Sequence, residues 1–338
     1  MTTIHSNFSL QKFNTFGIEA KAKRFVAVHS IDELKVVLQQ NPEERKFILG
    51  GGSNMLLTQD IDALVIHIDL KGKTILKQDD DFVWIACQAG ENWHEFVLWT
   101  LAHDYGGLEN MSLIPGNVGT TPIQNIGAYG AEVKDTMVSC DAINIHSLEM
   151  TTFSNEDCHF GYRESIFKQE AKDQYIITTV VFKLTKRNHN ISTTYGDIQS
   201  ELTKNGIVNP TIQQVSKAVI AIRQSKLPDP KELGNSGSFF KNPVLLKSEF
   251  EKIHIKFPEM KFYEVSDTEV KVPAGWLIEQ AGFKGKRFGD AGVHKNQALV
   301  LVNYGNATGQ EVLAVSKDIQ KTVFGKFGIH IEAEVNII

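Results

Sequence analysis

The chain has 338 residues, of which 42% are hydrophobic and 22% are charged, as in an ordinary globular protein. This length predicts two or three domains. The net charge of −5 gives no basic field that would attract nucleic acid or anionic lipid, and no apolar run reaches the ~20 residues of a membrane span. The N-terminus lacks the pattern of a secretory signal. We therefore expect a cytoplasmic protein with neither a nucleic-acid nor a membrane partner.

The three cysteines, Cys87, Cys140 and Cys158, are scattered and odd in number. This usage is typical of a reducing compartment and does not suggest a disulfide framework. Cys158-His159 has no second ligand pair at metal spacing, so we predict no metal site.

The first hundred residues predict four strands and two capped helices, one helix after the first strand and one after the fourth. Alternating or buried apolar residues predict strands at 24–29, 46–49, 63–70 and 82–89. Ser30-x-x-Glu33 and Asn92-x-x-Glu95 are capping boxes, each followed by helical periodicity. The second helix has an apolar face expected to lie in the core, formed by Trp93, Phe96, Val97, Thr100 and Leu101.

Two glycine-rich segments interrupt this pattern. Gly-Gly-Gly-Ser-Asn at 50–54 follows a predicted strand, and the stretch 114–130 contains four glycines, two prolines and two adjacent threonines. Glycine lets backbone amides approach phosphate oxygens, and the threonine hydroxyls could add hydrogen bonds. Each segment could equally be an ordinary structural turn. The first segment is not the dinucleotide fingerprint, since Met55 stands where its last glycine should be.

The rest of the chain continues the mixture of strands and helices. Strands are predicted at 138–146, 175–184, 298–303 and 330–338, and helices at 211–223, 273–281 and 308–323. A second glycine-rich turn is predicted at 234–243. Leu-Pro-Asp-Pro at 227–230 prevents continuation of the helix and predicts a domain boundary. Helices separate only some of the strands, which indicates an α+β fold.

Seven short motifs are informative when they are considered together. They are Asn-Thr-Phe-Gly at 14–17, Gly-Gly-Gly-Ser-Asn at 50–54, the stretch 114–130, Phe-Gly-Tyr-Arg-x-Ser at 160–165, Gly-Ser-Phe-Phe-Lys-Asn-Pro at 237–243, Ala-Gly-Trp-Leu-Ile at 274–278 and Glu-x-Glu-Val at 332–335. In this order, over nearly the whole chain, they resemble the UDP-N-acetylenolpyruvoylglucosamine reductase family. Members of that family complete UDP-N-acetylmuramate in bacterial peptidoglycan synthesis.

The resemblance implies a fold in three parts. Two α+β subdomains would form an FAD-binding fold of the vanillyl-alcohol-oxidase (PCMH) type, at 1–70 (joined by a C-terminal strand at 327–338) and at 71–227. A third α+β domain at 228–326 would bind the substrate. Thr194-Tyr195-Gly196-Asp197 resembles the substrate-covering loop of the loop-containing type I. No association helix is obvious, so a monomer is expected.

The resemblance also assigns ligands to particular residues. It implies non-covalent FAD with NADPH as reductant, and UDP-N-acetylglucosamine enolpyruvate as substrate. The implied FAD-binding residues are Gly50, Gly51, Gly52, Ser53, Asn54, Pro115, Gly116, Gly119, Thr120, Thr121, Ile123, Asn125, Gly127, Ala128 and Tyr129. The implied substrate-binding residues are Tyr195, Lys226, Asn242, Lys284 and Gln297, and Arg223 lies one helical turn before Lys226.

The implied reaction moves a hydride from flavin N5 to the vinyl carbon and a proton to its neighbour. A cation must then stabilise the charge that spreads into the carboxylate, and Arg163 fits this role because a guanidinium can fork onto a carboxylate. By resemblance Ser238 donates the proton and Glu334 is the third catalytic residue. Spacing alone does not separate Glu334 from Glu332, and a weakly acidic serine needs help from a neighbour such as Lys241.

Two other functions compete with this interpretation. One is a different flavin-dependent oxidoreductase on the same fold, which would commonly carry an additional His or Tyr near the flavin. The other is a sugar-nucleotide-binding protein without catalysis, which would not need Arg163, Ser238 and Glu334 together.

Overall fold

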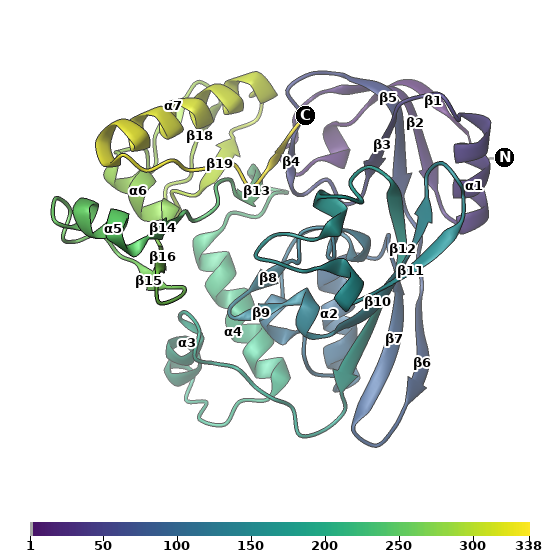
Figure 1. The fold of residues 1–338 in the computed structure, drawn as a ribbon, viewed down its shortest axis with the longest axis horizontal. Coiled ribbons are helices and arrows are strands. Elements are labelled where there is room, and N and C mark those ends of the chain that lie inside the picture. The colour runs from purple at the N-terminus through teal and green to yellow at the C-terminus, as the bar shows by residue number, and fades with distance from the viewer. Residues whose placement is uncertain (1–2) are drawn as a thin grey trace. The chain divides into compact units, whose positions relative to one another are not determined.

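A computed structural model describes residues 3–338 and divides into two compact units, each assembled from separate pieces of chain. The first contains residues 3–8, Ala22–Gly51 and Asp62–Arg223. The second contains Ser9–Lys21, Gly52–Ile61 and Gln224–Ile338. Helices and mainly antiparallel sheets occur in both, so the predicted α+β class is confirmed (Figure 1). No helix within the described residues has the length and apolar character needed to cross a bilayer.

The first unit is built on two sheets. One has the strand order β1-β2-β5-β3, with β3 and β5 parallel, and the other is antiparallel with the order β11-β10-β12-β7-β6. Their strands are β1 (His5–Ser9), β2 (Lys21–Val28), β3 (Lys46–Leu49), β5 (Ile61–Ile68), β6 (Lys73–Gln78), β7 (Phe82–Gln88), β10 (Met137–Asn144), β11 (Met150–Ser154) and β12 (Tyr175–Thr185). The helices are α1 (Ile31–Gln40), α2 (Trp93–Ala102), α3 (Ile198–Lys204) and α4 (Ile212–Lys226).

Helix α2 anchors the larger core of this unit. Asn92 caps it by accepting a 3.0 Å hydrogen bond from the Glu95 N–H, as the capping box predicts. Trp93 and Phe96 are fully buried, and the Trp93 indole donates to the Met111 carbonyl at 3.0 Å. Burying one such side chain contributes about 1.5–3 kcal/mol, so the helix gives a firm base to the segment that follows it.

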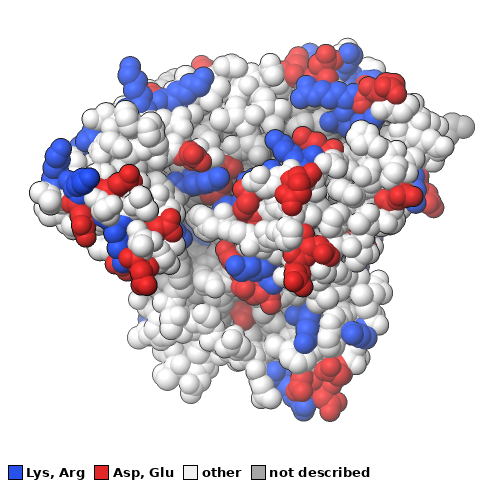
Figure 2. Space-filling model, in the orientation of Figure 1, with Lys and Arg blue, Asp and Glu red and all other residues white. Residues whose placement is uncertain are grey.

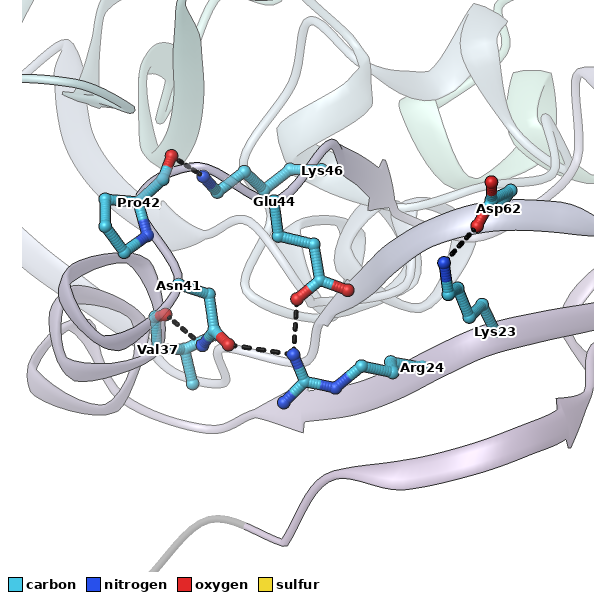
Figure 3. Close-up of polar contacts among 8 residues, drawn as sticks. All are labelled: Lys23, Arg24, Val37, Asn41, Pro42, Glu44, Lys46 and Asp62. Atoms are coloured by element: carbon cyan, nitrogen blue, oxygen red, sulfur yellow. Dashed lines mark hydrogen bonds and ion pairs between the residues drawn. The ribbon is translucent and has the colours of Figure 1, made fainter.

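Helix α1 is fixed at both ends by polar contacts. Ser30 accepts from the Glu33 N–H at 3.1 Å, as predicted. At the other end the Asn41 amide donates to the Val37 carbonyl at 2.8 Å and accepts from Arg24 at 2.9 Å, while Arg24 also pairs with Glu44 (Figure 3). These contacts stabilise the helix terminus locally.

The second unit contains a four-stranded antiparallel sheet, a three-stranded sheet and a short parallel pair. Their strand orders are β13-β19-β18-β17, β14-β16-β15 and β20-β4. The strands are β4 (Met55–Leu56), β13 (Gly234–Ser238), β14 (Val244–Leu246), β15 (Tyr263–Glu264), β16 (Glu269–Lys271), β17 (Arg287–Phe288), β18 (Ala291–Val293), β19 (Val300–Asn303) and β20 (Asn336–Ile337). The helices are α5 (Lys247–His254), α6 (Ala274–Gln280) and α7 (Gly309–Phe327).

The predicted glycine-rich turn at 234–243 is wrong over its first half, which is strand β13. Ser238 pairs with Val300 of β19 across an irregular register. Gly234 packs so closely on the Phe16 carbonyl that a Cβ would lie 2.2 Å from its oxygen. Glycine is therefore needed here because another backbone segment lies close to the strand. Composition alone does not distinguish such a glycine from one in a turn.

The predicted final strand at 330–338 is also largely wrong, because only Asn336–Ile337 forms a strand. Ile331 and Val335 are buried, which explains the alternation in the sequence. The segment nevertheless changes partner: the Glu334 N–H donates to the Phe239 carbonyl at 2.8 Å, and β20 then pairs in parallel with β4. The alternation of apolar and polar residues therefore indicates which side chains are buried, and it does not indicate a continuous strand.

Candidate active site

Within the first unit, Gly50 and Gly51 of the first predicted glycine-rich segment meet the stretch 114–130. A Cβ on Gly50 would lie 2.6 Å from the Thr120 methyl, and one on Gly51 would lie 2.8 Å from the Gly116 Cα. Side chains at either glycine would force the segments apart. The absence of side chains here allows backbone from both segments to approach a single ligand.

The stretch 114–130 is fixed to the end of β7 and the start of α2. The Gly119 N–H donates to the Ala89 carbonyl at 2.9 Å, and the Trp93 N–H donates to the Gly116 carbonyl at 3.0 Å. Thr120 and Thr121 donate their hydroxyls to carbonyls of their own turn, at 2.7 and 2.8 Å. Because both hydroxyl hydrogens are engaged, the predicted donation to a phosphate would require these bonds to break. The hydroxyl oxygens can still accept hydrogen bonds.

A short hairpin follows, formed by β8 (Gly127–Ala128) and β9 (Ala131–Glu132). Its turn residue Tyr129 has a positive φ of 51°. A Cβ on Gly130 would lie 3.3 Å from the Tyr195 Cβ, so the predicted substrate loop lies against the predicted cofactor stretch. Tyr195 itself is 59% exposed, which leaves its ring accessible to a ligand.

Arg163 is presented by a tight turn from Gly161 to Glu164, whose backbone groups bond to each other at 3.0 and 3.4 Å. Its φ of 56° is the left-handed conformation. The guanidinium donates to the Gly127 carbonyl at 2.7 Å. Nearby, the Ser165 hydroxyl donates to the Ile123 carbonyl at 2.7 Å. The structure therefore attaches the predicted catalytic cation directly to the predicted cofactor stretch.

Arg223 is another cation of the first unit. The Arg223 Nε is buried without a hydrogen-bond partner, and no carboxylate among residues 3–338 pairs with this guanidinium. Burial lowers the pKa of Arg223, while the Tyr129 phenol acts in the opposite direction. An uncompensated buried charge is costly, so this arrangement fits an anionic ligand such as the phosphates of a nucleotide cofactor or substrate.

His94 borders the same region and was missed from the sequence. Its Nδ1 accepts the Leu113 N–H at 2.9 Å, immediately before the stretch 114–130. Burial lowers the His94 pKa, as does the charge of Arg223, while Glu95 raises it. A single histidine on a helix gives no sequence signal for this contact.

The second unit brings together three predicted site residues. Ser238 is exposed at the end of β13, and the adjacent Phe239 carbonyl accepts the Glu334 N–H. The Asn54 amide donates to the Glu334 carbonyl at 3.4 Å. Glu334 is half-buried whereas Glu332 is exposed. The glycine turn at Gly52, Ser53 and Asn54, the proposed proton donor and the second glutamate are thus neighbours along paired segments.

The predicted substrate residues fall into different settings. The Asn242 Oδ1 accepts the Ala274 N–H at 2.9 Å, and a Cβ on Gly275 would lie 3.1 Å from the Gln297 Oε1, so both side chains converge on the first turn of α6. Lys284 instead pairs with Glu279 at 2.8 Å. Lys226 is the last residue of α4. Within the second unit, Asn242 and Gln297 are thus brought together.

Charges on the face shown in Figure 2 are mixed, with Lys and Arg interspersed among Asp and Glu. No three His, Cys, Asp or Glu side chains of the described chain gather as a possible metal site.

Comparison with known proteins identifies the class. Residues 22–152 match the family described as FAD binding domain, and residues 229–338 match UDP-N-acetylenolpyruvoylglucosamine reductase, C-terminal domain. The crystal structure of UDP-N-acetylenolpyruvylglucosamine reductase from Thermus caldophilus has a similar fold, with a TM-score of 0.70 at 23% identity, covering 100% of this chain and 98% of that one. The protein is a flavin-dependent oxidoreductase.

Close relatives then identify the family. UDP-N-acetylenolpyruvoylglucosamine reductase of Flavobacterium johnsoniae is 78% identical over 99% of both chains. The enzyme of the same name from Pseudomonas putida is 46% identical over 97% of both. The chain belongs to the UDP-N-acetylenolpyruvoylglucosamine reductase family.

Proposed function

We propose that this enzyme uses NADPH and non-covalent FAD to reduce UDP-N-acetylglucosamine enolpyruvate to UDP-N-acetylmuramate in bacterial peptidoglycan synthesis. Its family membership supports the reaction. The observation that carries the assignment of residues is the pairing of the Ser238–Phe239 segment with Glu334. FAD, when bound, supplies the hydride that NADPH provides.

Arg163 stabilises the substrate carboxylate while negative charge develops on the carbon beside it. Guanidinium remains charged at all relevant pH values and offers paired N–H donors to a carboxylate. Its contact with the Gly127 carbonyl supports this role, because it holds the cation beside the proposed cofactor stretch.

Ser238 donates the proton to that carbon. Its exposure at the end of β13 supports contact with a substrate. Glu334 supports the transfer by hydrogen bonding, and its half-buried position beside the Phe239 backbone favours it over the exposed Glu332. Neither residue has a histidine adjacent in sequence, so a Ser-His nucleophile is not proposed.

The remaining assignments follow the same proposal. The FAD-binding residues lie in the two glycine-rich segments, and Asn242, Gln297, Tyr195, Lys226 and Lys284 bind the sugar nucleotide. Arg223 is added as a partner for an anionic group of a bound nucleotide. We also propose the division at 1–70, 71–227 and 228–326, a monomeric state and a cytoplasmic location.

The test is turnover with product identification. FAD-loaded protein, NADPH and UDP-N-acetylglucosamine enolpyruvate should yield a sugar nucleotide that has gained two hydrogen atoms, measured by mass spectrometry. UDP-N-acetylglucosamine, which lacks the enol ether, is the matched control and should not accelerate NADPH oxidation. An unchanged substrate mass under these conditions would refute the proposed function.

A further inference from the structure

Asn125 is a buried hydrogen-bonding hub in the stretch 114–130. It is 0% exposed and has a φ of 43°. Its amide nitrogen donates at 3.0 Å to both the Glu132 carboxylate and the Gly161 carbonyl, and its Oδ1 accepts the Lys134 N–H at 3.1 Å. The side chain is thus engaged by the protein on all sides, so only its backbone could contact the cofactor.

One of these bonds fastens Asn125 to the base of the turn that presents Arg163. The Gly161 carbonyl accepts both the Asn125 amide and the Glu164 N–H, which form the base of the turn. Arg163 occupies the turn in a left-handed conformation that non-glycine residues adopt at a cost. Such a conformation persists only where surrounding bonds enforce it, and Asn125 supplies one of them.

The same hub fixes the opposite end of the Arg163 side chain. The guanidinium donates to the Gly127 carbonyl, and Gly127 pairs with Glu132, the residue that accepts from Asn125. Asn125 therefore holds the base of the turn and the hairpin on which the guanidinium rests. Displacement of either would move the cation relative to the cofactor stretch.

We propose that Asn125 is a positioning residue that sets the placement of Arg163 toward the substrate carboxylate. This inference rests on the proposed function, because it takes Arg163 as the group that stabilises that carboxylate. Asparagine suits the position since it tolerates the left-handed region and can donate and accept simultaneously. No other uncharged side chain of similar length combines these properties at a positive φ.

The decisive experiment is a double-mutant cycle on flavin reoxidation. Asn125→Gly removes the side chain without penalising the positive φ, and Arg163→Ala removes the cation. Bound flavin is reduced anaerobically with dithionite and mixed with UDP-N-acetylglucosamine enolpyruvate in a stopped-flow instrument. We expect Asn125→Gly to slow reoxidation by about 10- to 100-fold, the scale of misplacing a catalytic group by about 1 Å.

The second step of the cycle separates positioning from a general effect. In the Arg163→Ala background, adding Asn125→Gly should slow reoxidation no further, because the group that it positions is gone. Equal, additive losses in both backgrounds would overturn the inference.

Two further variants keep the test independent of folding. Asn125→Asp preserves size and the acceptor for Lys134 but cannot donate to Gly161, so it should reproduce the slow reoxidation. Asn41→Gly is the matched control, since it removes an asparagine that bridges Val37 and Arg24 at the end of α1 (Figure 3). It should lower the melting temperature and leave reoxidation unchanged; slowing by Asn41→Gly equal to that of Asn125→Gly would overturn the inference.

The wild-type protein distinguishes this inference from the proposed function. If wild-type reduced flavin is not reoxidised by the enolpyruvyl sugar nucleotide, the proposed function fails. If wild type reacts and the cycle is additive, the function stands and the positioning role of Asn125 fails.

Discussion

Ser238 is the residue whose proposed role is chemically most demanding, because a serine hydroxyl is a weak acid. It stands exposed after Gly237, which has a φ of 72°, and before the buried Phe239. This location gives it freedom to meet a substrate while the following residues fix the strand. Its chemistry must therefore be tested separately from substrate binding.

Ser238→Ala should leave flavin reduction by NADPH nearly intact, because no proton donor to carbon is required in that step. Flavin reoxidation by the enolpyruvyl sugar nucleotide should slow on the order of 10²–10⁴-fold, the usual contribution of general acid catalysis. Anaerobic stopped-flow absorbance resolves the two steps. Equal slowing of both would exclude Ser238 as the specific proton donor.

His94 predicts an acid-sensitive contact at the start of the cofactor stretch. Its neutral ring accepts the Leu113 N–H, and burial lowers its pKa below the ordinary value near 6.5. The unfolded state therefore binds the proton more readily, so this contribution is present above about pH 6.5 and is lost as the pH falls through the folded pKa.

His94→Asn should consequently make stability less sensitive to acid, because the amide Oδ1, placed like the Nδ1 of histidine, can accept the Leu113 N–H without titrating. The measurement is the urea midpoint at about pH 7.5 and about pH 5.5. Some acid sensitivity should persist, since burial also lowers the pKa values of His67 and His294. An identical drop in wild type and variant would contradict this role of His94.

For single residues, the sequence predicted which positions need a glycine better than it predicted which side chains contact one another. The glycines at 50, 51 and 116 were predicted as close-approach positions, and the structure brings them together. The hydrogen bonds of the Asn125 side chain could not be predicted. Nor could the burial of the Arg223 Nε without a hydrogen-bond partner. Both depend on which segments pack around a side chain, and adjacent residues carry no information on that.

At the scale of elements, capping residues were the most reliable signals. Ser30 and Asn92 each accept the expected N–H at the start of a helix. Thr308 with Glu311 forms a complete capping box at the start of α7. The helix ends were less well predicted: α4 was expected to stop near Arg223 but runs to Lys226. Polar capping residues thus predict where a helix begins more accurately than where it ends.

Missed elements were short or depended on distant partners. Strand β6 is mostly exposed and pairs as an edge with β7, so its side chains show no core-facing alternation. Helix α5 buries only Phe250. The strands β14, β15 and β16 have two or three residues each. Whether so short a segment forms a strand depends on the strand with which it pairs, and its own residues do not show this.

Helix α7 offers a paired test of packing against propensity. A Cβ on Gly309 would lie 1.7 Å from the Leu57 carbonyl oxygen, whereas nothing lies within 4 Å of a Cβ on the exposed Gly325. Gly309→Ala should destabilise by about 1–3 kcal/mol because backbone must move. Gly325→Ala should stabilise by up to about 1 kcal/mol through helix propensity.

Equilibrium urea unfolding measures both changes. The opposite signs are the essential result, because the two substitutions are chemically identical and lie in one helix. Stabilisation by Gly309→Ala would mean that the start of α7 does not pack on the Leu57 backbone.

At the scale of the whole molecule, the α+β class and the family followed from the sequence, and the two interleaved units did not. Residues 9–21 and 52–61 belong to the unit that contains the C-terminal part of the chain. The contacts responsible join positions far apart, such as Asn54 with Glu334 and β4 with β20. No local pattern of composition reports such pairings.

The proposed reaction takes Arg163, Ser238 and Glu334 as its catalytic residues. Its central claim is that one bound flavin accepts reducing equivalents from NADPH and delivers them to the enol ether. Anaerobic addition of one equivalent of NADPH should bleach the oxidised-flavin absorbance. Adding UDP-N-acetylglucosamine enolpyruvate should then restore it without oxygen, whereas flavin that stays reduced after this addition would contradict the account.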